Sequence, residues 1–255
     1  MPLFQFLRRK WIASKPFPGS WLKILEERVP VWRRLPSGYR ETLKKHMPIL
    51  MAEKNYEGCA GLELTEEKKV IITAYACVPI LAETADYYDG LQAILVYPDS
   101  YVAPVMEYEE GGVVTEGFEP RSGEYRGTGN IVLAWSEIEK TVRGEAAGQN
   151  LIYHEFSHLL DDRYGLSSGV TDHGEIVRED EWTRTLGKAY KRHLRNMRGN
   201  RRSVLDEYGA TSPAEFFSVA SEAFFESAEE LFREMPDLYR ILKDFYGLDP
   251  ISWKG

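Results

Sequence analysis

The chain has 255 residues, 43% of them hydrophobic, which is enough for one large globular domain or two small ones. Its formal net charge is −8, so neither nucleic acid nor an anionic membrane is expected as the main partner, because both need a basic surface. The basic cluster of Arg8, Arg9 and Lys10 is too short to change this expectation.

The cysteines and the N-terminal sequence point to a cytoplasmic location. Cys59 and Cys77 form neither a C-x-x-C pair nor a disulfide-rich pattern. No stretch reaches the roughly 18 apolar residues of a membrane span, and the first basic residues follow the short apolar start, the reverse of a secretory signal. We therefore expect a cytoplasmic protein with no membrane and no direct nucleic-acid partner.

The first half of the chain changes from helical to strand-like periodicity. Residues 1–50 are predicted to form helical segments separated by prolines. A longer helix is predicted over about 65–85, bent at Pro79. Gln92–Tyr97 and Asn130–Trp135 are short β-rich runs with hairpin or loop sequence between them, which indicates a small sheet.

Helical patterns return after the predicted sheet, over about 147–162, 176–197, 213–231 and 236–245. Strands gathered between two helical regions favour an α+β fold over a doubly wound one. We predict a mainly helical single domain over residues 1–255, with a small mixed or antiparallel sheet beside the helix at about 147–162. In this prediction a helical segment, residues 1–60, packs on a core formed by residues 61–255.

The most informative motif is H-E-x-x-H, formed by His154, Glu155 and His158. On a helix, residues four apart lie on one face, so both imidazoles can reach one metal ion. Glu155 lies about 100° around the helix from His154, which suits a base beside the metal rather than a ligand. With five histidines in the chain, composition alone produces such a pattern roughly once in a hundred cases.

A catalytic zinc ion usually has three protein ligands, so the motif predicts a third one elsewhere. Glu215 and Glu222 are seven residues apart on one predicted helix, and both are candidates. Ser212-x-x-Glu215 is also a capping box, in which the glutamate side chain bonds back to the Ser212 N–H. The pattern alone therefore favours neither a capping role nor a metal-ligand role for Glu215. Asp161 is a third candidate, although it more readily orients a ligand histidine than binds the metal itself. His173 is a fourth candidate, but it lies in a predicted loop, where an isolated histidine is usually not a ligand.

The sequence around these residues resembles the Mlc titration factor A family of zinc-dependent peptidases. The resemblance is carried by His154–Asp161 and by the segment from Tyr208 to Phe225, and it extends over nearly the full length. Further similar segments are Gly61–Thr65, Val96–Pro98 and Gly148–Asn150. The resemblance implies a catalytic core similar to that of the anthrax lethal factor protease domain.

The resemblance also implies a role for each site residue. It assigns His154, His158 and Glu215 as ligands of one Zn²⁺ per chain, Glu155 as general base and Tyr208 as hydrogen-bond donor to the transition state. It implies a peptide or protein substrate, and a glucose-responsive transcriptional repressor as a further partner. Ser157 occupies a motif position where alanine is common in the family, which bears only on local packing.

The expected function is therefore hydrolysis of peptide bonds by a metal-activated water. An extended substrate is expected to add as a strand beside Ile131–Trp135. The alternative is a non-catalytic protein that binds and sequesters a regulator while keeping a zinc site. A purely structural zinc site is disfavoured, because such sites normally have four protein ligands and are rich in cysteine.

Overall fold

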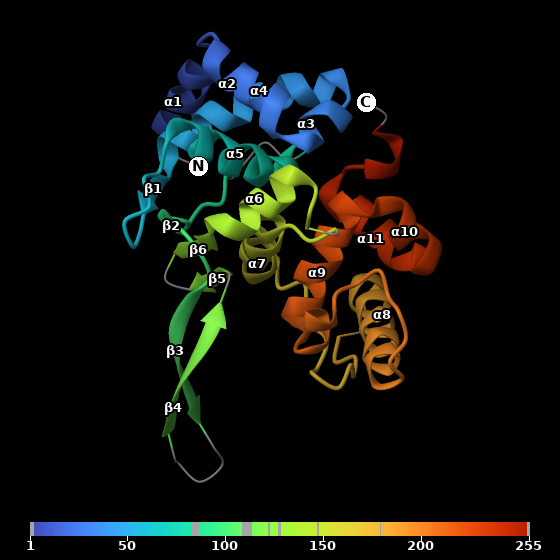
Figure 1. Cartoon of the computed structure of the whole chain (residues 1–255). Coiled ribbons are helices and arrows are strands. Elements are labelled where there is room, and N and C mark those ends of the chain that lie inside the picture. Colours follow the sequence, from blue (N-terminus) through green and yellow to red (C-terminus); the bar gives the residue numbers. More distant parts are fainter. Residues whose placement is uncertain are drawn as a thin grey trace.

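The computed structural model describes residues 3–82, 87–108, 114–121, 123–126, 129–146, 148–178 and 180–253, with side chains of 101–126 left outside the description. Within this part, helices dominate, and all strands but the first lie between two helical regions of the chain (Figure 1). The α+β prediction is confirmed. None of the described helices combines the length and the hydrophobicity that a membrane span requires.

The N-terminal region is a group of helices punctuated by proline. Pro18 and Pro36 immediately precede two of the helices, and Pro30 is the first residue of a third, positions where a missing N–H costs no helical hydrogen bond. The helices are α1 (Leu3–Ala13), α2 (Gly19–Arg28), α3 (Pro30–Arg34), α4 (Ser37–Glu53) and α5 (Glu66–Cys77). They gather at one end of the molecule (Figure 1).

Helix α5 is shorter than the sequence predicts. It ends at Cys77 and continues as a 3₁₀ turn, η1 (Val78–Ile80), which contains Pro79. Proline has no N–H for the α-helical hydrogen bond, so the helix changes type here instead of bending and continuing. The last part of the predicted range, residues 83–85, lies outside the described residues.

The main sheet has the strand order β1-β2-β6-β5 and is mixed. Strands β1 (Asn55–Gly58), β2 (Ala93–Tyr97) and β6 (Asn130–Ala134) are parallel, and β5 (Gly123–Arg126) is antiparallel to β6. The mixed form of the prediction is therefore correct and the fully antiparallel form is wrong. Strands β3 (Tyr101–Tyr108) and β4 (Val114–Arg121) form a separate antiparallel pair that projects from the molecule (Figure 1).

Strand β6 is not an edge strand, which corrects the expected substrate-binding strand Ile131–Trp135. It pairs with β2 on one side and with β5 on the other, and Trp135 already belongs to a helix. The edge on this side of the sheet is β5, which packs against the helix that carries the H-E-x-x-H motif. Short strands such as β1 and β5 lack a clear hydrophobic alternation, so the sequence did not indicate them.

Six helices follow the sheet in the described part of the chain, and two of them carry the candidate site. They are α6 (Trp135–Arg143), α7 (Leu151–Tyr164), α8 (Glu181–Arg198), α9 (Pro213–Glu226), α10 (Ala228–Glu234) and α11 (Pro236–Tyr246), with 3₁₀ turns η2 (Glu207–Ala210) and η3 (Pro250–Ser252). Helix α7 packs against α9, and the fully buried rings of Tyr153 and Phe225 meet between them with centroids 4.8 Å apart. Such a close-packed interior holds the two helices in a fixed relation.

Candidate metal centre

Helix α7 carries the motif and has well-defined ends. The Asn150 side chain accepts hydrogen bonds from the N–H groups of Ile152 and Tyr153 at 3.1 and 3.2 Å. Asparagine is a favoured residue at this capping position, because it satisfies backbone donors that the first helical turn leaves free. At the other end, Gly165 adopts the left-handed conformation, with φ of 61°, that ends many helices.

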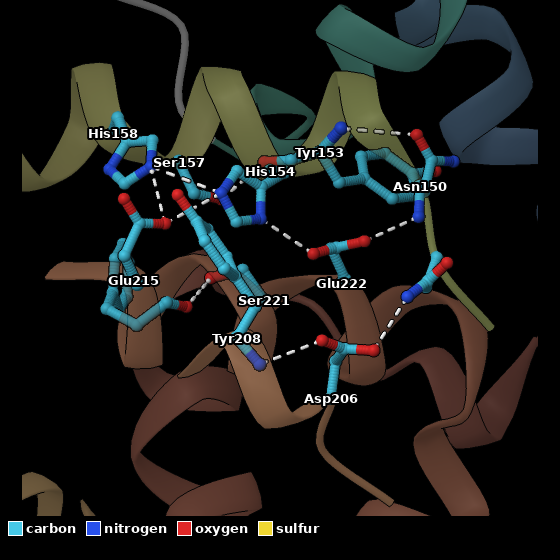
Figure 2. Close-up of polar contacts among 12 residues, drawn as sticks. Asn150, Tyr153, His154, Ser157, His158, Asp206, Tyr208, Glu215, Ser221 and Glu222 are labelled. Carbon is cyan, nitrogen blue, oxygen red and sulfur yellow. Dashed lines mark hydrogen bonds and ion pairs between the residues drawn. The ribbon is translucent and has the colours of Figure 1, made fainter. Parts of the chain in front are cut away.

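Three side chains from α7 and α9 converge at one point (Figure 2). His154 Nε2 lies 2.9 Å from Glu215 Oε2 and 3.3 Å from His158 Nε2. His158 Nε2 lies 3.2 Å from the same Glu215 oxygen. Among the described residues, only His154, His158 and Glu215 form a group that could hold a metal ion, with one ligand atom each within 4.8 Å of the others.

The spacing of these atoms fits a metal ion. Bonds of about 2.0–2.1 Å in a tetrahedral arrangement place neighbouring ligand atoms roughly 3.3–3.4 Å apart. The separations of 3.3 and 3.2 Å that involve His158 Nε2 are close to this value. The third separation, 2.9 Å between His154 and Glu215, requires only a small movement of the flexible glutamate side chain. The donor set of two imidazoles and one carboxylate suits a divalent cation.

Electrostatics at the cluster favour positive charge. Burial alone would raise the pKa of Glu215, but hydrogen bonds with His154 and His158 lower it to about 2. Burial alone would lower the pKa of His154, but its hydrogen bonds with Glu215 and Glu222 raise the pKa well above the ordinary value. The carboxylates thus stabilise a cation between the helices, whether a proton or a metal ion.

Glu155 is buried next to the metal-binding group, and one of its carboxylate oxygens accepts no hydrogen bond from the described residues. Only 3% of the residue is exposed, and its Oε2 atom has no hydrogen-bond partner among the described residues. Burial raises the pKa of Glu155 to about 7, against the opposing effect of His154 and His158. A general base works best with a pKa near the operating pH, so the environment of this carboxylate suits proton transfer.

His154 is oriented by Glu222, one of the two glutamates that the sequence left open. Glu222 Oε1 lies 2.7 Å from His154 Nδ1, on the opposite side of the ring from Glu215 (Figure 2). The other Glu222 oxygen accepts a hydrogen bond of 2.6 Å from the Asn150 N–H. A carboxylate on the second ring nitrogen fixes the tautomer and rotation of a ligand histidine.

A chain of polar side chains continues behind Glu222 and was not evident from the sequence. Asn150 Nδ2 donates to Glu226 Oε1 at 2.8 Å, and Arg34 donates to Glu226 Oε2 at 3.0 Å. Through these bonds an arginine of α3 supports the groups that orient His154. The one available signal was Gly148–Asn150, which resembles the family but carries no chemistry of its own in the sequence.

The role considered for Asp161, support of a ligand histidine, is wrong. Asp161 accepts hydrogen bonds from the N–H and hydroxyl groups of Ser167, at 2.7 and 2.6 Å, and thereby holds the turn after α7. Asp161 does share a helix face with His154, but the turn that follows α7 captures its side chain before it can reach the histidines. His173 is exposed and lies outside the metal-binding group, in the loop before α8.

Glu215 and Tyr208 both lie near the motif histidines. Ser212 caps α9 by accepting from the Glu215 N–H at 3.2 Å, while the Glu215 side chain faces the histidines instead of completing a capping box. Tyr208, on η2, has its ring centroid 5.9 Å from that of His154 and is 52% exposed. Figure 2 shows its side chain directed toward the cluster.

Replacement of Glu222 by glutamine is expected to weaken metal binding by roughly 10–100-fold, because an amide is a poorer acceptor for the His154 N–H. Metal titration of the chelated protein measures this effect. Asp161→Asn is the matched control, since Asp161 bonds only to Ser167 among the described contacts. Equal metal affinity in Glu222→Gln and the wild type would show that Glu222 supports the fold and not the metal centre.

The fold and the site define a class of proteins in which an H-E-x-x-H helix and a glutamate of a second helix could together hold a metal ion. Residues 3–247 match the family model of the glucose-regulated metallo-peptidase M90, and the chain belongs to this family. This finding confirms the resemblance found in the sequence. It assigns the chain a metallopeptidase fold and implies a metal.

Named relatives cover most of the chain. The uncharacterized protein slr2042 of Synechocystis sp. is 34% identical over 245 residues, which are 96% of this chain and 89% of the relative. Mlc titration factor A of Klebsiella pneumoniae is 28% identical over 226 residues, covering 88% and 84% of the two chains. Mlc titration factor A of Yersinia pestis is 29% identical over 250 residues, covering 95% and 90%.

Proposed function

We propose that this protein is a zinc-dependent peptidase that hydrolyses peptide bonds by general-base attack of water. The observation that carries the proposal is the convergence of His154, His158 and Glu215 beside the buried carboxylate of Glu155. Three protein ligands leave a coordination position open, as catalytic zinc sites require. Family membership supports the same reaction class.

Zinc is the metal that best suits this donor set. Two imidazole nitrogens and one carboxylate oxygen form the ligand set of well-known zinc peptidases, whereas Mg²⁺ and Ca²⁺ prefer oxygen ligands. When bound, zinc polarises a carbonyl group and lowers the pKa of a water molecule toward 7. His154, His158 and Glu215 would hold it, and Glu222 would orient His154.

Glu155 and Tyr208 would then divide the chemistry between them. The Glu155 carboxylate would take a proton from the attacking water and later deliver it to the leaving amine. The Tyr208 hydroxyl would donate a hydrogen bond to the oxygen on which negative charge develops. Helix α7 fixes Glu155 within the packed interior, and η2 presents Tyr208 from the solvent side.

The substrate is proposed to bind along β5. This strand ends the sheet and packs against α7, so its outer edge can receive an extended peptide through backbone hydrogen bonds. Recognition through the backbone favours broad over narrow side-chain specificity. We propose β5 in place of β6 as the substrate-binding strand, because both edges of β6 are already paired.

The proposed function is tested by returning zinc to protein that has been stripped with a chelator. Cleavage of an unstructured peptide library, followed by mass spectrometry, is expected to stop after chelation and to recover fully at one zinc ion per chain. Cleavage that persists in the stripped protein would contradict the proposal.

Tyr208→Phe is expected to lower kcat by roughly 10²-fold with little change in metal content. A hydrogen bond that forms mainly in the transition state contributes to turnover rather than to substrate binding. The phenylalanine ring preserves the packing, so thermal stability should remain close to that of the wild type. Steady-state kinetics and metal analysis of one preparation measure both effects. Unchanged kcat with reduced stability would place Tyr208 in the scaffold instead.

Binding of a transcriptional repressor is a second candidate function, favoured by relatives named Mlc titration factor A. Such a partner would place this protein in the cytoplasm. Repressor binding and hydrolysis are compatible in one chain. A His154→Ala variant that still binds a glucose-responsive repressor would separate the two, because it lacks a metal ligand but keeps its surface.

A further inference from the structure

Helix α1 is fixed to the protein by one face. The Arg9 guanidinium makes two hydrogen bonds to the Glu53 carboxylate of α4, at 2.9 and 2.6 Å, and both side chains are 8% exposed. Ile12, three residues further, is also buried. Residues three apart lie on the same side of a helix, so Arg9 and Ile12 define the anchored face.

The opposite face of α1 is apolar and exposed. Leu3, Phe4, Leu7 and Trp11 are 73, 79, 55 and 61% exposed. Viewed down the helix axis, these four side chains fall within an arc of roughly 100°. The middle of this arc is about 170° away from Arg9, so the apolar stripe lies opposite the anchored face. Four large apolar side chains on one stripe of one short helix differ from the singly scattered apolar residues that are normal on protein surfaces.

Basic residues flank this apolar stripe. Lys10 and Lys15 lie against the rings of Phe6 and Trp11, with Nζ 4.8 and 3.5 Å from the ring centroids. Neither lysine has a carboxylate partner among the described residues. Residues 1–25 contain five lysines and arginines and no acidic residue, although the whole chain carries a net charge of −8. The partner of this face should therefore be both apolar and negatively charged.

We propose that α1 is an interfacial helix that attaches this protein to the surface of an anionic lipid bilayer. Leu3, Phe4, Leu7 and Trp11 would enter the boundary between headgroups and acyl chains, while Lys10 and Lys15 would face the anionic headgroups. The helix lies in the membrane plane and does not span it. From the net charge of −8 we expected no membrane partner. The net charge of the whole chain does not reveal that basic residues are in local excess over residues 1–25.

A second copy of the chain is a less suitable occupant. A helix of 11 residues is roughly 16 Å long and 10 Å wide, so one face covers on the order of 160 Å². A stable protein interface buries about 800 Å² on each partner. Two adjacent lysine-bearing faces would also repel each other, whereas an anionic bilayer attracts both.

Sedimentation with lipid vesicles tests the proposal on the full-length protein. Vesicles of phosphatidylcholine and phosphatidylglycerol in a 7:3 ratio are expected to sediment the protein, and pure phosphatidylcholine vesicles to sediment far less. The Phe4→Ser, Leu7→Ser, Trp11→Ser triple variant should lose binding by at least about tenfold. Its matched control is Phe232→Ser, a change of the same kind at a residue that is 51% exposed elsewhere.

A second variant tests the charges separately. Each basic residue near an anionic surface strengthens binding roughly fivefold, so Lys10→Gln with Lys15→Gln should weaken it on the order of 20-fold. Lys188→Gln with Lys191→Gln, on the exposed face of α8, is the matched control and should bind normally. Circular dichroism establishes that all variants fold. Cleavage of soluble peptides should not change in any of them, so this test is independent of the proposed peptidase function.

Two results would overturn the proposal. One is failure of the wild-type protein to sediment with phosphatidylglycerol vesicles, or equal sedimentation of the triple variant. The other is a concentration-dependent dimer, seen by light scattering without lipid, that the triple variant abolishes. That result would assign the face to a second copy of the chain.

Discussion

Glu155→Gln is expected to abolish most hydrolysis while the protein retains its metal. The glutamine side chain has the same size but cannot accept a proton from water, so kcat/KM should fall by about a hundredfold or more. Metal content should stay near that of the wild type, because the Glu155 carboxylate is not among the three converging ligand atoms. Peptide cleavage and elemental analysis of the same preparation measure both quantities.

The buried position of Glu155 provides an additional readout. Burial of an ionised carboxylate without a full set of partners destabilises the folded state, and burial is what raises the pKa of Glu155. The neutral amide removes this cost, so metal-free Glu155→Gln should be at least as resistant to urea as the metal-free wild type. Cleavage close to the wild-type rate in this variant would contradict the role of Glu155 as the base.

Glu215→Ala is expected to lose the metal, and with it all metal-dependent cleavage. The variant removes one of three ligand atoms and leaves His154 and His158 without the carboxylate that neutralises the cation. Metal affinity should fall by more than about 100-fold, beyond the effect expected for a residue that only orients a ligand. Competition with a chromophoric chelator measures this affinity.

Asp161→Asn is the control for Glu215→Ala, because both remove one carboxylate from the region of α7 and α9. The Asp161 carboxylate bonds to Ser167, so its replacement should lower thermal stability and leave metal affinity unchanged. If the two variants exchange these outcomes, so that Asp161→Asn loses the metal and Glu215→Ala keeps it, the ligand assignment is incorrect.

The sequence predicted those parts of the site that depend on local spacing. Two histidines and a glutamate at H-E-x-x-H positions on an uninterrupted helical pattern fix the geometry of His154, Glu155 and His158 before any tertiary contact is known. The Ser212-Pro213 start of α9 was visible for the same reason, since capping residues act within one turn. The mainly helical α+β fold followed from the change of period along the chain.

Features set by tertiary contacts could not be predicted in this way. From spacing alone Glu215 was equally a cap or a ligand, and only the packing of α9 on α7 brings its carboxylate to the histidines. The same packing gives Glu222, not Asp161, the contact with His154. The exposure of the apolar stripe on α1 could not be predicted either. An apolar helix face is normally expected to be buried, and only the positions of the neighbouring helices show that this one is not.

The zinc content of the purified protein tests the central claim most directly. Protein prepared without chelator from zinc-supplemented cells should contain close to one zinc ion per chain by elemental analysis, since two histidines and a glutamate on packed helices form a tight site. The His154→Ala, His158→Ala double variant, prepared in parallel, should contain almost none. A wild-type protein without zinc, or a double variant that retains a full equivalent, would contradict the account.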